Sequence, residues 1–250
     1  MKDTIRIAAM SDLHCRVSST GVLAPLLSRA AEHADILVLC GDLTDFGKPE
    51  EAQILAKELN VVRIPMVGVL GNHDYESNHV AEVTKILCDS GVQLLDGDVY
   101  EAHGVGFAGV KGFAGGFGRG LLRPWGEPSI KAFVHEAIEE ALKLECALGS
   151  LRTEHRIALT HYAPIEATVR GEPAEIFPFL GTDRLEDALH RYPVDMVFHG
   201  HAHHGTPEGH TSRGIPVFNV ALPLLQRTTE LPFRLVELSN VREQTLSATA

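Results

Sequence analysis

Five short apolar segments along the chain share one pattern, because each ends where polar or glycine-rich residues begin. The segments span residues 4–10, 35–40, 61–70, 156–160 and 194–198, and the residues that follow them read SDLH, GDLTD, GNHD, HYAP and HGHAH. The first three segments lack the alternation of apolar and polar residues that marks a half-exposed strand. They are therefore predicted to be strands that are buried on both faces.

Apolar residues at helical spacing fill the intervals between these segments. They cover residues 21–33, 48–59, 79–89, 129–148 and 183–191. The alternation of strand and helix predicts an α/β fold with largely parallel strands. Further short strands are predicted at 92–95, 98–102, 105–109, 215–220 and 232–238. Two sheets packed face to face, with helices outside them, accommodate this number of strands, and we expect residues 1–250 to form a single domain.

Chemically active side chains gather just after the predicted strands. In open α/β sheets, ligands bind beyond the carboxyl ends of the strands, which is where these side chains fall. Two pairs are spaced two residues apart, so an extended backbone would project both members of a pair to one face. The seven side chains are Asp12, His14, Asp42, Asn72, His161, His201 and His203.

This set offers two carboxylates, one amide oxygen and four imidazoles as metal ligands. Such a mixture suits divalent Mn, Fe, Co, Ni or Zn, and it is poor for Ca or Mg, which prefer oxygen ligands. Seven ligands are too many for one transition metal with an open position, but they fit two metals that share a bridging carboxylate. The charge of two divalent ions exceeds that of two carboxylates and one hydroxide, so the centre keeps a net positive charge. Phosphate esters, which are anionic, are the natural substrates of such a centre.

The overall charge of the chain narrows the choice of partners. The formal net charge is −11 over 250 residues, and no tract is rich in Lys or Arg, which argues against binding to long nucleic acid. No apolar run has the length of a membrane span, and the first residues enter a strand-like segment without the features of a signal peptide. Four cysteines without a CxxC pair fit reduced thiols. We therefore expect a cytoplasmic protein that acts on a small phosphoester, with its oligomeric state left open.

Five sequence blocks together resemble the calcineurin-like metallophosphoesterase superfamily. The blocks are DLH (12–14), GDLTD (41–45), GNHD (71–74), His161 and GHAH (200–203), and they occur in that order over most of the chain. The resemblance implies a four-layer α/β/β/α sandwich with two metals at the strand ends. It also implies ligand roles: Asp12, His14 and His203 for the first metal, Asn72, His161 and His201 for the second, and Asp42 as the bridge.

The resemblance implies catalytic roles for two further residues. His73 would lie close to the scissile phosphate, where it protonates the leaving group or stabilises developing charge. Asp74 would hold the other ring nitrogen of His73 and so fix its tautomer. The reaction implied is in-line attack of a metal-bridging hydroxide on a small phosphomonoester or phosphodiester.

The remaining polar residues near the blocks are expected to have supporting roles. We expect His199 to make a hydrogen bond beside the ligands, His204 to face solvent, and Asp45 to order its loop as a hydrogen-bond acceptor. Other pocket residues suggested by position are Tyr162, Pro164 and Arg170.

A glycine-rich stretch at 104–127 allows two interpretations. It carries Lys111, Arg119 and Arg123, so it could be a mobile loop in which Lys111 and Arg119 bind the substrate phosphate. The alternative is a hairpin followed by a long surface loop, in which the glycines form turns.

Competing functions remain at this stage. A cyclic-nucleotide phosphodiesterase would have the same blocks, since they hold only the phosphate. A nuclease and a protein phosphatase fit less well, because basic tracts and the arginines typical of a phosphatase groove are missing. A non-catalytic scaffold of the same fold could lose His73 or metal ligands, whereas this chain keeps them all.

Overall fold

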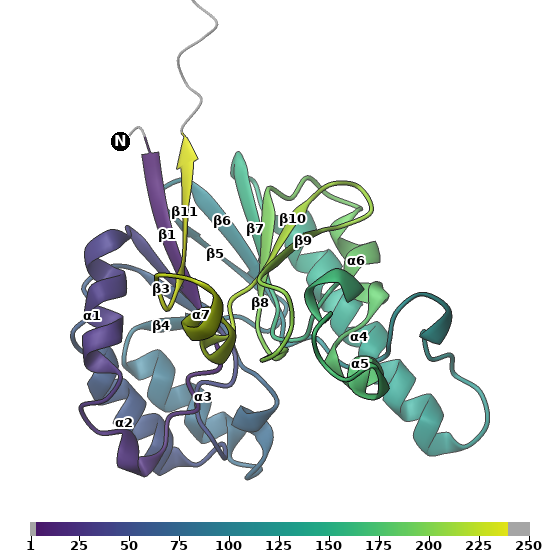
Figure 1. The fold of residues 1–250 in the computed structure, drawn as a ribbon, viewed down its shortest axis with the longest axis horizontal. Coiled ribbons are helices and arrows are strands. Elements are labelled where there is room, and N and C mark those ends of the chain that lie inside the picture. The colour runs from purple at the N-terminus through teal and green to yellow at the C-terminus, as the bar shows by residue number, and fades with distance from the viewer. Residues whose placement is uncertain (1–3, 240–250) are drawn as a thin grey trace, which may run out of the picture.

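The computed structural model describes residues 4–239, which form two β-sheets with helices on their outer faces (Figure 1). The first sheet has the order β11-β1-β2-β3-β4. Its strands are β1 (Thr4–Met10), β2 (Ile36–Cys40), β3 (Met66–Val69), β4 (Val92–Leu94) and β11 (Arg234–Ser239). Strands β1 to β4 are parallel, and β11 runs antiparallel beside β1.

The second sheet has the order β5-β6-β7-β8-β10-β9. Its strands are β5 (Asp98–Ala102), β6 (Val105–Gly109), β7 (His155–Leu159), β8 (Met196–His199), β9 (Glu208–His210) and β10 (Pro216–Asn219). The four inner strands are parallel, and the two edge strands β5 and β9 are antiparallel to their neighbours.

Helices cover the outer face of each sheet. The first sheet carries α1 (Ala24–His33), α2 (Pro49–Leu59) and α3 (Val80–Asp89), and the second carries α4 (Pro128–Ser150) and α6 (Asp183–Leu189). Two shorter helices are α5 (Phe177–Leu180) and α7 (Leu222–Thr228), and short 3₁₀ helices are η1 (Val17–Ser19), η2 (His73–Tyr75), η3 (Gly118–Gly120), η4 (Glu166–Thr168) and η5 (Ala174–Ile176). The predicted four-layer α/β/β/α sandwich is confirmed. Within residues 4–239, the helices are too short or too polar to cross a membrane.

Strand β1 shows why its sequence lacks polar alternation. Ile5, Ile7 and Ala9 lie in the apolar layer between the two sheets, whereas Ala8 and Met10 pack toward the outer helices. All five side chains are buried. Because both faces of the strand are covered, neither set of alternate positions is polar.

The strands predicted from the sequence are all present, although some are shorter. Of the predicted segment 61–70, only Met66–Val69 forms a strand, because Val62 still closes the last turn of α2 and Pro65 has no N–H for a ladder bond. The short elements α5, α7 and β9 were not predicted.

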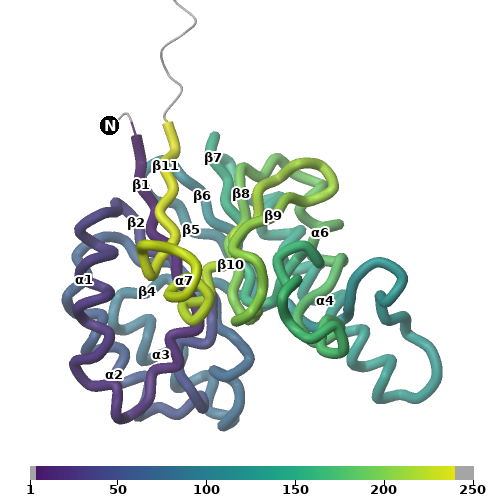
Figure 2. The backbone as a smooth tube through the Cα atoms, viewed as in Figure 1, coloured from purple at the N-terminus to yellow at the C-terminus, as the bar shows by residue number. Residues whose placement is uncertain are grey.

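The carboxyl ends of the parallel strands define one edge of the molecule. In Figure 2 the chain enters β1 beside β11 at one end of the first sheet and leaves β1 at the opposite end. The loops that leave β2 and β3 lie at that same end because these strands are parallel to β1, and the loop after β8 meets Asp12 there through the N–H of His201. Each of these loops carries side chains that the sequence singled out.

Candidate metal centre

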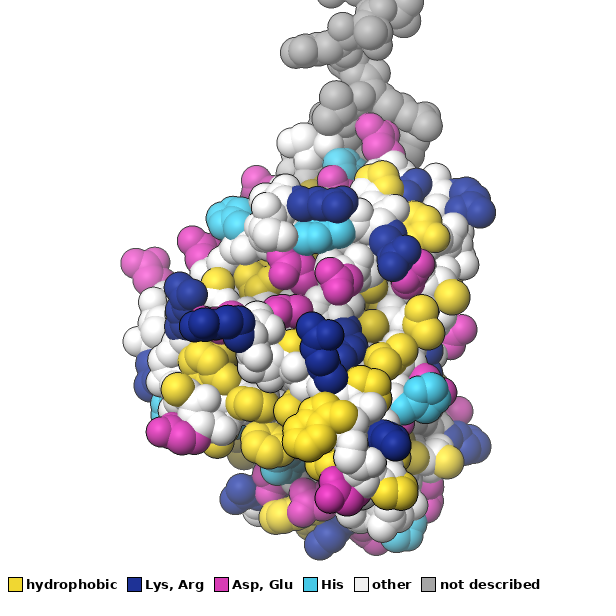
Figure 3. Space-filling view, turned by 90° about the vertical axis from the view of Figure 1, so that its right-hand side faces the viewer, with side chains coloured by type: hydrophobic (Ala, Val, Ile, Leu, Met, Phe, Trp, Pro, Cys, Tyr) yellow, Lys and Arg dark blue, Asp and Glu magenta, His cyan; other side chains and the backbone are white. Residues whose placement is uncertain are grey.

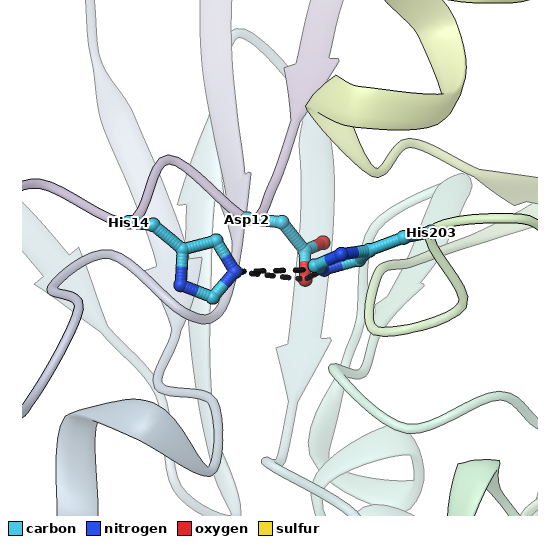
Figure 4. A group of neighbouring side chains, drawn as sticks. All are labelled: Asp12, His14 and His203. Carbon is cyan, nitrogen blue, oxygen red and sulfur yellow. Dashed lines mark hydrogen bonds and ion pairs between the residues drawn. The ribbon is translucent and has the colours of Figure 1, made fainter.

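The first group of side chains at this edge consists of Asp12, His14 and His203 (Figure 4). Their ligand atoms all lie within 4.8 Å of one another. Nε2 of His203 lies 2.9 Å from Oδ1 of Asp12, and Nε2 of His14 lies 4.0 Å from the same oxygen. The two imidazole nitrogens are 3.5 Å apart. Two ring nitrogens and a carboxylate oxygen that converge in this way can hold one cation.

The second group brings together Asp42, His161 and His201, with Asn72 beside them. Nε2 of His161 lies 3.3 Å from Oδ1 of Asp42 and 2.9 Å from Oδ1 of Asn72. The rings of His161 and His201 have their centroids 4.8 Å apart. This group therefore offers oxygen and nitrogen atoms for a second cation.

The carboxylate of Asp42 lies between the two groups. Its Oδ2 is 3.9 Å from Nε2 of His14, and its Oδ1 is 3.3 Å from Nε2 of His161. Oδ1 also accepts a hydrogen bond from the backbone N–H of His73. One carboxylate thus presents a different oxygen to each group, which is the arrangement that a bridging ligand requires.

Backbone carbonyls fix the orientation of two of the rings, and a carboxylate lies beside a third. Nδ1 of His161 donates to the carbonyl of Cys40, so Nε2 is left to face Asp42. Nε2 of His201 donates to the carbonyl of Phe179, which leaves Nδ1 as its free nitrogen. Nδ1 of His14 lies 3.3 Å from Oδ1 of Asp45. Such outer partners set the tautomer and the direction of each ring nitrogen.

Four residues of the two groups have a left-handed backbone. The φ angles are 56° for Asp12, 42° for His14, 48° for Asp42 and 69° for His201. Non-glycine residues in this region cost about 1–3 kcal/mol each and persist where the surrounding structure enforces them. The concentration of this strain at one edge of the sheets points to a functional centre.

Two glycines let the backbone approach the carboxylates closely. A Cβ atom at Gly71 would overlap Oδ1 of Asp42, and one at Gly200 would overlap Oδ2 of Asp12 and the hydroxyl of Ser11. The space beside each carboxylate therefore exists only because these positions lack a side chain.

The two carboxylates are buried and ionised. Burial alone would raise the pKa of Asp12, but the hydrogen bond from His203 and the charge of His161 hold that pKa far below its usual value. Burial also opposes the ionisation of Asp42, yet its pKa is lowered, chiefly by His161. Burial would lower the pKa of His161, but Asp42 raises it to about 9. The two carboxylates and the imidazoles around them form a mixed oxygen and nitrogen donor set, which fits divalent transition metal ions.

His73 lies next to the first group, with its ring edge-on to that of His14 at a centroid distance of 4.6 Å. The predicted contact with Asp74 is wrong. Nδ1 of His73 donates to the backbone carbonyl of Asp45 over 2.6 Å, whereas the carboxylate of Asp74 accepts hydrogen bonds from the loop that holds Asp42. Its donors are the backbone N–H groups of Leu43, Thr44 and Gly71 and the hydroxyl of Thr44. The carboxylate of Asp74 is directed into this turn because four donors converge on it there.

Sequence reasoning missed four groups that lie against ring nitrogens of the histidines. They are the carbonyls of Cys40 and Phe179 and both the carbonyl and the carboxylate of Asp45. A backbone carbonyl leaves no trace in residue identity. Only the aspartate, the last residue of GDLTD, left a signal, and it had been expected to order its loop rather than to lie against a histidine.

Two further histidines, His199 and His204, lie in the same segment as His201 and His203. His199 is fully buried and contacts the hydroxyl of Thr168 and the carbonyl of Gly200, each over 2.8 Å. It therefore supports the backbone next to His201 rather than a ligand ring. His204 is exposed.

The glycine-rich stretch divides into two parts. Residues 98–109 form the hairpin of β5 and β6, and 114–117 are buried, with Gly115 and Gly116 bonded to the backbone of Pro178 and Gly181. The part that follows is exposed and reaches beyond the sheets before α4, and its Trp125 is 67% exposed. On the side of the molecule shown in Figure 3, apolar side chains gather with basic ones beside them.

The structure separates the two residues of this stretch that were predicted to bind substrate. Arg119 is exposed on η3, and within residues 4–239 no hydrogen bond or ion pair joins it to the metal centre. Lys111 lies nearer, since its carbonyl accepts the N–H groups of His161 and Tyr162. The ring of Tyr162 packs at 4.5 Å from that of His201, whereas Arg170 is exposed and lies 3.3 Å from Glu166. Pro164 is buried.

The sandwich and the carboxylate–histidine cluster at its strand ends define the class of protein: a metal-dependent hydrolase of phosphoesters. The sequence model of the calcineurin-like phosphoesterases matches residues 5–205, and the chain belongs to that family. The resemblance seen in the sequence blocks is thereby confirmed. Comparison with curated protein sequences gives no match.

Solved structures share the fold at low sequence identity. Phosphopantetheinyl hydrolase from Mycobacterium tuberculosis is 17% identical with a TM-score of 0.66, over 94% of this chain and 97% of that one. TT1561 of Thermus thermophilus is 16% identical with a TM-score of 0.53, over 94% and 99%. GAP50, the anchor in the inner membrane complex of Plasmodium, is 13% identical with a TM-score of 0.55, over 96% and 82%. These likenesses concern the fold alone.

Proposed function

We propose that the protein hydrolyses a small phosphomonoester or phosphodiester at a centre of two divalent transition metal ions. The observation that carries the proposal is the position of Asp42, whose two carboxylate oxygens face separate histidine groups. The residues that would hold the first ion are Asp12, His14 and His203, and those for the second are Asn72, His161 and His201, with Asp42 shared.

When bound, two such ions supply positive charge to the phosphoryl oxygens and lower the pKa of water toward neutrality, which suits in-line displacement. The mixed nitrogen and oxygen donors favour Mn, Fe, Co, Ni or Zn. The chain holds these donors in place through its strained backbone and through the carbonyls that fix the histidine rings.

His73 is the residue we assign to the leaving group. Its Nδ1 is engaged by the carbonyl of Asp45, so its Nε2 is the nitrogen left to face a substrate. In its protonated form, the ring donates through Nδ1 to Asp45 and carries a second proton on Nε2. That proton can pass to the departing oxygen or stabilise the charge that develops on it.

The experiment that tests this function combines metal analysis with an assay of Asp42→Asn. The purified wild type is expected to bind two divalent ions per chain and, loaded with Mn, Ni or Zn, to hydrolyse bis(p-nitrophenyl) phosphate. The variant is expected to lose this activity, whereas Asp89→Asn, an exposed partner of Lys85 on α3, serves as the matched control. Unchanged hydrolysis by Asp42→Asn would contradict the two-metal mechanism.

A substrate panel refines the proposal. Phosphomonoesters, linear phosphodiesters and cyclic nucleotides are assayed in parallel with the metal-loaded wild type. A preference for cyclic nucleotides would make the protein a cyclic-nucleotide phosphodiesterase. No turnover of any phosphoester would favour a binding protein of the same fold.

A further inference from the structure

A cavity of about 490 Å³ lies beside the metal centre, at the same edge of the sheets. Its walls come from the end of β3, from η2, from α3 and from the segment between β4 and β5. The residues that matter for its chemistry are Leu70, Tyr75, Val80, Leu94, Asp96 and Lys111. The volume is in the range of a small-molecule site, and no residue proposed as a metal ligand lines it.

The cavity shares parts of its wall with the centre. Leu70 directly precedes Gly71 and Asn72, and Tyr75 belongs to the same 3₁₀ helix as His73. Lys111 is tied to the other side, because its carbonyl accepts the N–H group of His161 over 2.9 Å. A ligand that spans the centre and the cavity would therefore have to cross only the strip between η2 and the loop after β7.

The ammonium group of Lys111 is the main charged feature of this cavity. It donates to the carbonyl of Gly112 over 2.7 Å, and it lies 4.9 Å from the ring centre of Phe113, 5.4 Å from that of Tyr162 and 5.6 Å from that of Tyr75. An ammonium group has three N–H donors, and the rings accept none of them as a conventional hydrogen bond. Two donors are thus available to a ligand.

Of the acidic groups around Lys111, which include Glu136 and the cavity-lining Asp98, Glu140 and Asp96 are engaged elsewhere. Glu140 accepts the N–H of Gly112 with Oε2 and the ammonium of Lys143 with Oε1, each over 2.7 Å. Asp96 also pairs with Lys143, over 2.9 Å. Within residues 4–239, no carboxylate oxygen lies within ion-pair distance of Lys111. Burial lowers the pKa of Lys111, as expected for a buried ammonium group that has no carboxylate at ion-pair distance.

We propose that this cavity binds the part of the substrate remote from the scissile phosphate, and that Lys111 binds a second anionic group there. The inference rests on the proposed function and narrows its substrate class. The substrate is then a phosphoester with a largely apolar body, which packs against Leu70, Val80 and Leu94, and with a carboxylate or a second phosphate at its far end. An anion supplies the charge and the acceptors that Lys111 lacks in the protein itself.

The test uses matched substrates and the variant Lys111→Met, which keeps the length of the side chain and removes its charge. The substrates are phenyl phosphoesters that carry a para carboxyalkyl chain of one to three methylenes, and each is paired with its neutral carboxamide. The ester is the monoester or the methyl diester, whichever the wild type hydrolyses faster. Lys85→Met, on the exposed face of α3, is the control for loss of a lysine charge.

We expect the wild type to prefer at least one carboxylate over its carboxamide by about 10- to 100-fold in kcat/KM, the range of one hydrogen bond to a charged group. The difference should appear mainly in KM. In Lys111→Met the preference should fall to near one, and in Lys85→Met it should persist. Because the ratio compares two substrates in one protein preparation, it does not depend on the fraction of the variant that is folded.

Three outcomes overturn the inference in distinguishable ways. A wild type that hydrolyses bis(p-nitrophenyl) phosphate but prefers no carboxylate overturns the assignment of the cavity and leaves the proposed function intact. A preference that survives in Lys111→Met overturns the role of Lys111. A wild type that hydrolyses no phosphoester overturns the proposed function and this inference with it.

Discussion

Nδ1 of His73 donates a hydrogen bond to the backbone carbonyl of Asp45 over 2.6 Å. The side chain of the same aspartate lies elsewhere, with Oδ1 at 3.3 Å from Nδ1 of His14 and Oδ2 at 2.8 Å from Nε of Arg16. One residue therefore lies against two histidines: its main chain accepts a hydrogen bond from His73, and its carboxylate lies within ion-pair distance of His14. Substitution of the side chain separates these two roles.

Asp45→Ala is expected to weaken metal binding while leaving His73 in place. Loss of an outer partner of a ligand typically costs about 10- to 100-fold in metal affinity. Titration of the metal-free protein with Mn²⁺ measures the change, and Asp89→Asn is the control. A reduced kcat that persists at saturating metal would show that the carboxylate of Asp45 acts on His73 as well.

His73→Gln is expected to lower kcat by about 10²- to 10⁴-fold, the usual contribution of a proton donor or acceptor. Two bound metal ions should remain, since the ring of His73 belongs to neither of the two groups around Asp42. Activity and metal content are measured on the same preparation, with the exposed His135→Gln on α4 as the control. Full activity of His73→Gln would exclude the residue from the reaction.

Asp74→Asn is expected to destabilise the turn rather than to free the ring of His73. The carboxylate is fully buried and accepts hydrogen bonds from Leu43, Thr44 and Gly71. Replacement of one oxygen by an NH₂ group leaves a donor facing a donor, at a cost of about 1–3 kcal/mol in the free energy of unfolding. Denaturant unfolding of the metal-free protein measures this cost, and a variant as stable as the wild type would contradict the bonding described.

Gly71→Ala is expected to abolish activity through sterics alone. A Cβ atom there would overlap Oδ1 of Asp42, so the bridging carboxylate or the turn has to move. Gly120→Ala is the matched control, because a Cβ at that position meets no atom within 4 Å. Its free energy of unfolding should stay within about 0.5 kcal/mol of the wild type. Normal metal content and activity in Gly71→Ala would disprove the close approach.

The carboxylate of Glu58, which lies outside the metal centre, is expected to make the stability of the folded protein depend on pH. Its carboxylate accepts N–H groups at the start of α1, from Gly21 over 2.7 Å and from Leu23 and Ala24 over 2.9 Å each. Burial would raise the pKa of Glu58, but these three donors lower it below the ordinary 4.5. A carboxyl with a lowered pKa stabilises the folded state above its ordinary pKa, and this contribution is lost as the pH falls through the lowered value.

Glu58→Gln is therefore expected to be less stable than the wild type by about 1–3 kcal/mol at pH 7. The difference should be constant down to about pH 4.5 and shrink below it. Urea unfolding of both proteins over a pH series measures it, and the exposed Glu32→Gln should show no such trend. If the difference in the free energy of unfolding grew as the pH fell, the pKa of Glu58 would not be lowered in the folded protein.

Much of the fold could be predicted because burial leaves a direct trace in the sequence. Strands such as β2, with all five residues buried, read as continuous apolar runs, and their ends are marked by the change to polar residues. The helices α1 to α4 and α6 were recognisable from their spacing. The exposed stretch before α4 has neither signal, and the buried residues 114–117 that precede it are held by contacts with Pro178 and Gly181 far along the chain.

The structure brings together the seven side chains predicted as metal ligands, but their geometry could not be predicted. Spacing of two residues was taken to project Asp12 with His14, and His201 with His203, from an extended backbone. Instead, Asp12, His14 and His201 are left-handed, and the second pair diverges, His203 toward Asp12 and His201 toward His161. Backbone strain of this kind depends on tertiary contacts, which residue identity does not encode. The contact partner of His73 was missed for the same reason, since it is a carbonyl.

The pairing of β1 with β11 has a consequence for synthesis on the ribosome. Thr4 lies opposite Ser239 and Ala9 opposite Arg234, so the strand that leads to Asp12 gains this neighbour only when the last described residues have been made. Until then β1 is the exposed edge of its sheet, a position prone to pairing with other chains. The nascent protein must therefore keep this edge protected through most of its translation, and contacts of such long sequence separation also make for slow folding.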